Sequence, residues 1–340
     1  MILAATVSLI VLLLASQTWR WASPASLMLL LASAGALLAL QKPQLGLIGL
    51  VLTALLVNRE FGTGTEVNLN PTTLLVPVLF ILWLLDVVRR RDISLTNSRT
   101  TRPLVLFLLA ALLSLLIGRA TWDPAVPTRS NFLLVQLAQW AIFAFSAVAF
   151  WLAANLLHEE TWLRRLTQAL LLVGGVLAIA IAVLGVGRVV GSISTLATFR
   201  TPFWVLLTGL AGGQLLFNKR VSASWRLYLV VVLLAILVYA FRLQQEATSN
   251  WVGVASVVGV LVWLRWPRLR WPIVAAIVVL GLIGVLFPSI YDFAGGDVEW
   301  QRSGGSRLVL SERVIDVTMR NPITGLGPAA YRPYANMTPL

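Results

Sequence analysis

The stretch NFLLVQLAQWAIFAFSAVAFWLAANLL, residues 131–157, indicates the fold class, because it is predominantly apolar and carries no charged side chain. An α-helix rises about 1.5 Å per residue, so a run of this length crosses the roughly 30 Å of hydrocarbon in a bilayer. A helix also satisfies its own backbone hydrogen bonds, as lipid requires. The stretch therefore predicts a membrane-spanning helix.

Similar runs fill most of the 340 residues, of which 59% are hydrophobic and only 11% charged, with a mean hydropathy of +0.87. Soluble domains average about 25% charged residues, so a cytosolic enzyme or a secreted domain is excluded. Strands are disfavoured, because barrel strands alternate polar and apolar residues. The sequence predicts an all-α polytopic transmembrane bundle of about eleven helices, at 2–17, 24–40, 44–57, 71–88, 103–118, 131–157, 166–187, 202–217, 227–241, 250–264 and 271–288. The runs 44–57, 103–118 and 250–264 are short, so they are either half-helices or extend into their flanks.

A net charge of +13 is compatible with binding to nucleic acid, but the Lys and Arg residues lie in short loops between the apolar runs. The connections after every second predicted helix hold fourteen basic residues, and the alternate connections hold seven. This is the bias of the positive-inside rule. It excludes a nucleic-acid partner and places the N-terminus in the cytoplasm and the C-terminal segment outside.

Residues 1–288 form the predicted bundle, and residues 289–340, which are polar and rich in glycine, begin an external loop. Within this loop a short amphipathic helix is expected over 306–320, capped by Ser306 and ended by Pro322. It should lie on the bundle through the apolar residues Leu308, Leu310, Val314, Ile315 and Val317. Gly325 and Gly327 then permit a tight turn.

The amino-acid composition limits which kinds of site and reaction are compatible with this chain. The chain has no cysteine and a single histidine, so thiolate and histidine metal centres are disfavoured. All Asp and Glu residues lie in loops or at helix ends, which disfavours an ion-coupled transporter. The first outer loop, 18–24, carries no acid, which disfavours a metal-dependent glycosyltransferase with an acidic residue there.

The external connections instead carry arginines, whose planar fork suits a diphosphate. The alternative is that they reach to lipid head groups. Arg242 also has a local partner candidate in Glu246. The external arginines are Arg188, Arg200, Arg242, Arg302, Arg307, Arg313, Arg320 and Arg332.

The segment SGGSRLVLSERVIDVTMRNPITGLGPAAY, residues 303–331, resembles the start of the large periplasmic loop of the O-antigen ligase and O-antigen polymerase superfamily. The most specific part is RNPITGLGP, residues 320–328, and the rest of the resemblance is topology. It implies a metal-independent glycosyltransferase of the bacterial inner membrane that needs no cofactor. The donor would be a polyprenyl-diphosphate-linked glycan, and the acceptor a hydroxyl of a lipid, a protein or a glycan.

The resemblance assigns stabilisation of the diphosphate to Arg307. The predicted substrate-binding residues beside it are Arg200, Arg242, Arg313, Gly325, Gly327 and Tyr331.

Two departures from the family stand out. At the position where the family has a second arginine, this chain has Asn250. Either Arg242 takes over the role of that arginine, or the chain belongs to a divergent branch of the family. The family's histidine base is absent, because His158 lies in a predicted cytoplasmic loop. We therefore expect a fragment that lacks the base. The alternatives are a transporter or flippase for a lipid-linked or amphipathic solute and a scaffold subunit.

Overall fold

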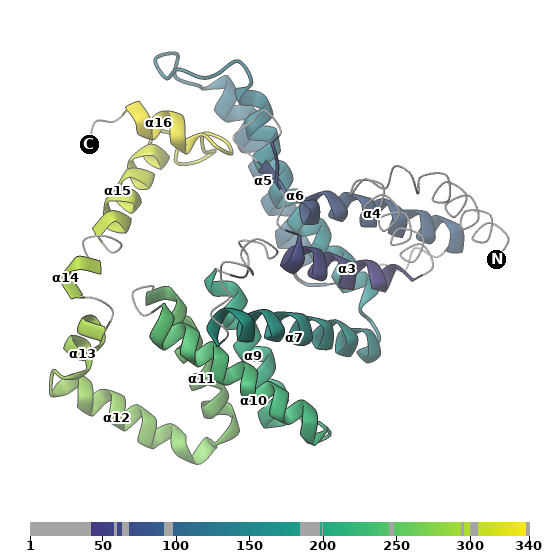
Figure 1. Cartoon of the computed structure of the whole chain (residues 1–340). Helices are drawn as coiled ribbons and strands as arrows, with labels where there is room; N and C mark the ends of the chain where they lie inside the picture. The colour runs from purple at the N-terminus through teal and green to yellow at the C-terminus, as the bar shows by residue number, and fades with distance from the viewer. Residues whose placement is uncertain are drawn as a thin grey trace, which may run out of the picture.

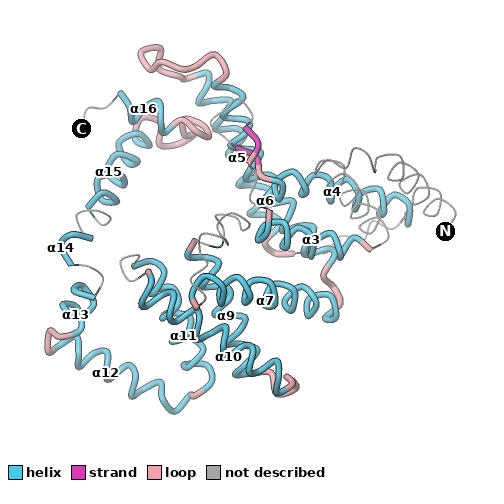
Figure 2. Tube along the Cα trace, in the orientation of Figure 1, coloured by secondary structure: helices cyan, strands magenta, loops and turns pink. Residues whose placement is uncertain are grey.

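The computed structural model describes residues 42–57, 60–62, 68–91, 98–183, 198, 200–244, 248–293, 296–299 and 305–337. Figure 2 shows helices joined by loops in this part of the chain, with one pair of short antiparallel strands, β1 (Phe61–Gly62) and β2 (Asn68–Leu69). The all-α class is therefore confirmed. The predicted helices 2–17 and 24–40, together with Arg188, Glu246 and Arg302, lie outside the described residues.

Figure 1 shows how the described helices are arranged along the chain. Their bounds are α3 Pro43–Leu56, α4 Pro71–Arg90, α5 Thr101–Ala120, α6 Phe132–Leu156, α7 Glu160–Ala182, α9 Thr201–Phe217, α10 Ala223–Val238, the π-helix η3 Tyr239–Leu243, α11 Thr248–Arg265, the 3-10 helix η4 Pro267–Leu269, α12 Arg270–Leu282, α13 Leu286–Phe293, α14 Gly296–Glu299, α15 Ser306–Met319 and α16 Tyr331–Met337.

Five helices of the described part are long and apolar enough to cross a membrane, namely α4, α5, α6, α7 and α10 continued by η3. A sixth candidate is the pair α11 and α12, which is bent by 114° between Arg265 and Pro267. The helices α3 and α9 are apolar but shorter. These helices indicate a multi-pass membrane protein, whereas the predicted count of about eleven is not confirmed.

Several predicted boundaries are corrected. The helix expected over 166–187 begins at Glu160. The helix expected over 271–288 is two helices, because α12 ends at Leu282 and the chain turns at Gly284, whose φ is +72°. Of the three short runs, 103–118 and 250–264 extend into their flanks as α5 and α11, while α3 stays short.

The helices α7, α9, α10 and α11 form the best-packed part of the molecule, here called the packed unit. Its side chains include Trp204, fully buried and stacked on Tyr239 with the ring centroids 3.7 Å apart. Glycines let the backbones approach, since a Cβ at Gly175 would overlap the Tyr228 hydroxyl and one at Gly253 would lie 2.6 Å from Val205 Cγ2. Small residues at helix interfaces are typical of membrane bundles.

A second cluster joins α3, α4 and α6 through Leu47, Leu79, Trp83, Leu152 and Leu156, and α3 also packs on α7. The chain after α11, from α12 to α16, is an arm that runs from the packed unit to the loop between α5 and α6 (Figure 1). Near its start, Phe293 of α13 meets Trp251 of α11 edge to face, with ring centroids 5.2 Å apart. We call this segment the C-terminal arm.

Within the arm, α15 confirms the helix expected over 306–320 almost to its ends. The expectation that Ser306 caps it is wrong, because the N-cap position is Gly305 and Ser306 is the first helical residue. The expected packing is also wrong. Val317 is buried, but the other four apolar residues, Leu308, Leu310, Val314 and Ile315, are exposed, because only the C-terminal end of α15 meets the rest of the protein.

Candidate functional site

The arm docks where α5 ends, and this contact is here called the junction. It joins the end of α5, the start of α6 and the loop between them, 121–131, to residues 320–334. The oxygen of Ser114 accepts a hydrogen bond from the backbone N–H of Gly327 at 3.1 Å. Gly118 lies against the Leu326 carbonyl, which a Cβ at this position would overlap. Because Gly118 has no side chain, the backbone of the arm can approach α5 this closely.

The motif RNPITGLGP has a physical explanation in the turn that it forms. The Asn321 amide donates to the Gly325 carbonyl at 2.9 Å, and its oxygen accepts from the Thr324 hydroxyl at 2.8 Å. Gly325 and Gly327 have φ of +72° and +93°, a region that favours glycine. Both φ values agree with the predicted tight turn.

Aromatic side chains complete the junction. The Tyr334 ring, 2% exposed, packs edge to face on Trp122, with centroids 4.8 Å apart. The Tyr334 hydroxyl accepts from the backbone N–H of Asp123 at 3.1 Å. The predicted site residue Tyr331 packs against the apolar cluster here, beside Val126 and Val317. It therefore has a packing role that the sequence did not predict.

Two cavities flank this aromatic layer. One, of about 500 Å³, combines a cation, a carboxylate and an amide, and it is lined by Thr121, Asp123, Arg320, Asn321, Leu326 and Tyr334. The Arg320 guanidinium also lies 5.4 Å from the centre of the Tyr334 ring. The other, of about 370 Å³, is lined by Arg119, Trp122, Thr128, Arg129, Ser130, Phe132, Leu133 and Gln136.

Gln136 is an unusual member of the second cavity. It is 1% exposed, and its amide nitrogen has no hydrogen-bond partner among the described residues. A buried amide left without a partner costs about 1–3 kcal/mol. Gln136 lines the second cavity, so its amide is a candidate donor to a ligand there.

The predicted arginines are not gathered at the junction. Arg307 is exposed at the first turn of α15, and α15 ends at the junction, roughly 20 Å away along the helix axis at about 1.5 Å per residue. Arg313 is half-buried on the same helix. Neither forms an ion pair within the described residues.

Arg200 and Arg242 lie at the packed unit instead. Arg200 precedes α9 and Arg242 lies in η3, and both are exposed. Beside them α9 and α11 are joined by the Thr201 hydroxyl, which donates to the Asn250 side chain at 2.5 Å. Asn250 is buried, and its bond to Thr201 joins the two helices. Figure 1 shows α15 standing apart from α9, α10 and α11.

No family model, curated protein or solved structure matches the chain. No group of three or more His, Asp or Glu side chains able to hold a metal lies within the described ranges. Sequence reasoning missed Ser114, Gly118, Asp123, Gln136 and Tyr334. The clearest available signal was Gln136, a polar side chain inside a predicted membrane helix.

Proposed function

We propose that the chain is a membrane glycosyltransferase of the O-antigen ligase and polymerase type. It transfers a glycan from a polyprenyl-diphosphate-linked donor to a hydroxyl acceptor at the outer face of a bacterial inner membrane, without a metal. The observation that carries this proposal is the junction. The segment that bears the resemblance, 320–328, docks on α5 and builds with Asp123 and Tyr334 a cavity of about 500 Å³.

The cavity has the charges that this reaction needs. An acceptor oxygen attacks the anomeric carbon, the bond from that carbon to the diphosphate breaks, and the acceptor proton leaves to a base. Charge develops on the departing diphosphate, and a guanidinium fixed in place stabilises it. We assign this role to Arg320, which lines the cavity. The resemblance gives the same role to Arg307, but this residue lies roughly 20 Å away along α15.

Asp123 is the carboxylate that lines the same cavity. One of its oxygens accepts from the backbone N–H of Ala125 at 2.9 Å, which fixes the side chain in the loop. We assign to it the proton transfer that the family gives to a histidine. Gln136 and Arg119 in the neighbouring cavity are assigned to the sugar, whose hydroxyls supply acceptors for the buried amide.

The test is glycan transfer by the full chain in proteoliposomes with undecaprenyl-diphosphate-linked oligosaccharide and a labelled acceptor. We expect R320A to lower the rate by about a hundredfold or more, as loss of a charge-stabilising donor does. D123N should lower it by a similar factor. R307A should have a smaller effect, because Arg307 lies roughly 20 Å from the cavity along α15. R102A, an exposed arginine at the first turn of α5 and therefore at the end opposite the junction, is the matched control.

Two results would contradict the proposal. One is wild-type transfer by R307A, R320A and D123N alike. The other is the absence of transfer by wild-type protein that nevertheless moves the intact lipid-linked glycan across the vesicle membrane, which a transporter would do.

A further inference from the structure

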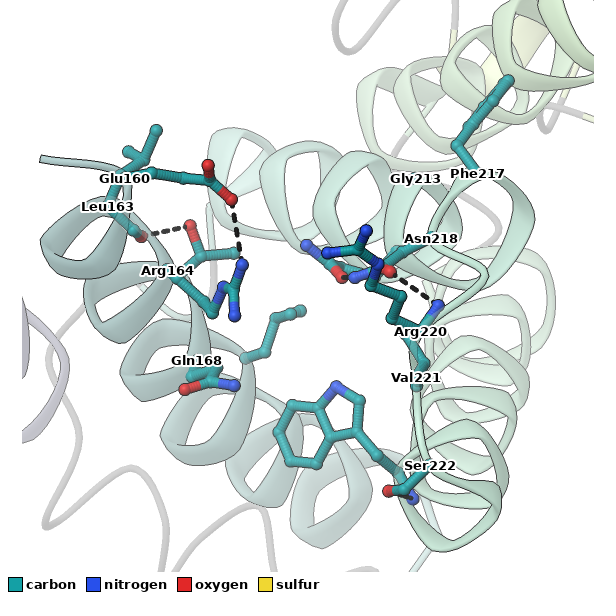
Figure 3. Close-up of a pocket in the computed structure, with 14 residues that line it drawn as sticks. Glu160, Leu163, Arg164, Gln168, Gly213, Phe217, Asn218, Arg220, Val221 and Ser222 are labelled. Atoms are coloured by element: carbon teal, nitrogen blue, oxygen red, sulfur yellow. Dashed lines mark hydrogen bonds and ion pairs between the residues drawn. The ribbon is translucent and has the colours of Figure 1, made fainter.

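A cavity lies at the other end of the packed unit from Arg200 and Arg242. It opens where α7 and α10 begin and α9 ends, and its volume is about 770 Å³ (Figure 3). The positive-inside count places this end in the cytoplasm. The cavity is lined by Glu160, Leu163, Arg164, Thr167, Gln168, Leu171, Gly213, Gln214, Phe217, Asn218, Arg220, Val221, Ser222 and Trp225.

Two arginines face this cavity from opposite walls, Arg164 from α7 and Arg220 from the turn before α10 (Figure 3). Arg164 bonds to Glu160 at 2.9 Å, but both side chains are mostly exposed, at 61% and 83%. An exposed ion pair of this kind contributes only about 0–1 kcal/mol, so it competes weakly with an incoming anion. The N-termini of α7 and α10 add positive potential at the same place.

The turn that carries Arg220 is held by local hydrogen bonds. The Asn218 amide donates to Gln214 Oε1 at 2.6 Å, and the Asn218 side-chain oxygen accepts from the backbone N–H of Arg220 at 3.0 Å. Arg226 donates to the Lys219 carbonyl at 3.1 Å. These bonds hold the backbone of the turn from which Arg220 extends.

The cavity is apolar on its membrane side. Leu171 is buried, and Trp225 stacks on Tyr228, with ring centroids 5.0 Å apart. The Tyr228 hydroxyl in turn donates to the Leu171 carbonyl at 3.0 Å, which ties α10 to α7 behind the cavity. A ligand that fits such a surface has a charged end and an apolar body.

We propose that this cavity binds the phosphate of an anionic phospholipid such as phosphatidylglycerol, with Arg164 and Arg220 on the phosphate and an acyl chain beside the Trp225 ring. Arginine forks suit phosphate, and basic pockets between transmembrane helices at the cytoplasmic side bind anionic head groups. A free phosphate shares this chemistry but does not use the apolar wall. The site is independent of the proposed glycosyl transfer, because none of the residues that line it lies at the junction.

The experiment measures lipid binding to the purified full chain. Native mass spectrometry in detergent counts retained phosphatidylglycerol and phosphatidylcholine, and a titration gives the affinity of each. We expect phosphatidylglycerol to be preferred, and R164Q and R220Q each to weaken its binding about fivefold. R268Q, which removes an exposed arginine of η4 outside the cavity, is the matched control and should change binding less than about twofold.

Further variants keep the test decisive if a glutamine variant folds poorly. R164K and R220K keep the charge and should retain most of the binding, while E160Q should strengthen it by removing the competing carboxylate. Competition with inorganic phosphate distinguishes a lipid head group from a free phosphate as the ligand. If millimolar phosphate displaces the lipid, the ligand is a free anion, and the lipid assignment is overturned. Unchanged phosphatidylglycerol affinity in the folded R164Q/R220Q double variant would overturn the site itself.

Discussion

The packed unit and the C-terminal arm are built in different ways. In the packed unit, large buried side chains such as Trp204, Leu207 and Leu229 fill the space between four helices. In the arm, Trp271 is 81% exposed and Leu282 84% exposed, and buried contacts are concentrated at the junction. Buried contacts extend through the whole packed unit, so a substitution there should lower the stability of the fold. In the arm they are concentrated at the junction, so a substitution there should change the position of the arm and hence the function.

The largest expected effect is on the stability of the packed unit. W204A removes a fully buried ring stacked on Tyr239, and a change of this kind typically costs about 3–5 kcal/mol. Reversible unfolding in mixed micelles, followed by circular dichroism, measures the loss. W271A in the arm is the control, and we expect it to change stability by less than about 0.5 kcal/mol. Equal losses in the two variants would remove the distinction between the regions.

The next effect is on the position of the arm. G118A places a methyl group on the backbone carbonyl of Leu326, which is part of a fixed turn and moves less easily than a side-chain end. We expect the arm to leave the junction, so that residues 320–334 become protease-sensitive, while the packed unit keeps its stability. G49A is the matched control, because a Cβ there meets nothing within 4 Å. A G118A protein with the wild-type cleavage pattern would show that the junction does not depend on this approach.

A smaller effect is expected from the hydrogen bond across the junction. Y334F removes the acceptor for the Asp123 N–H but keeps the ring on Trp122, so docking should weaken by about 0.5–1.5 kcal/mol. The rate of amide hydrogen exchange in the loop 121–131 measures this change and should be faster in Y334F than in wild type. Y331F is the control. Slower exchange in Y334F than in wild type would mean that the bond strains the loop.

The smallest effect is on titration within the arm. The Tyr291 hydroxyl donates to Asp297 at 2.6 Å, and this hydrogen bond, with the nearby carboxylate charges, raises the pKa of Tyr291 above its ordinary value of about 10. Because the raised pKa favours the protonated phenol, its contribution to stability is complete below that ordinary value and is lost as pH rises through the folded-state pKa. D297N should lower the pKa of Tyr291, read from tyrosinate absorbance against Y291F. An unchanged titration in D297N would exclude this hydrogen bond in solution.

The membrane helices could be predicted from the sequence because apolar runs and helix length are local properties. The turn at Gly325 and Gly327 could also be predicted, since a positive φ favours glycine. The junction could not, because the bond between Asp123 and Tyr334 joins residues 211 positions apart and no local pattern reports such a contact. The packing of α15 was mispredicted for a related reason. Its apolar spacing indicates a helix with an apolar side, but does not say what that side meets.

The ring contact between Trp251 and Phe293 closes the path of α11, α12 and α13 on itself. Although α11 and α12 are bent by 114°, the contact returns the end of α13 to the start of α11. For α11 and α12 as two spans, or as a re-entrant loop, it predicts that Phe293 lies at the membrane face from which α11 starts.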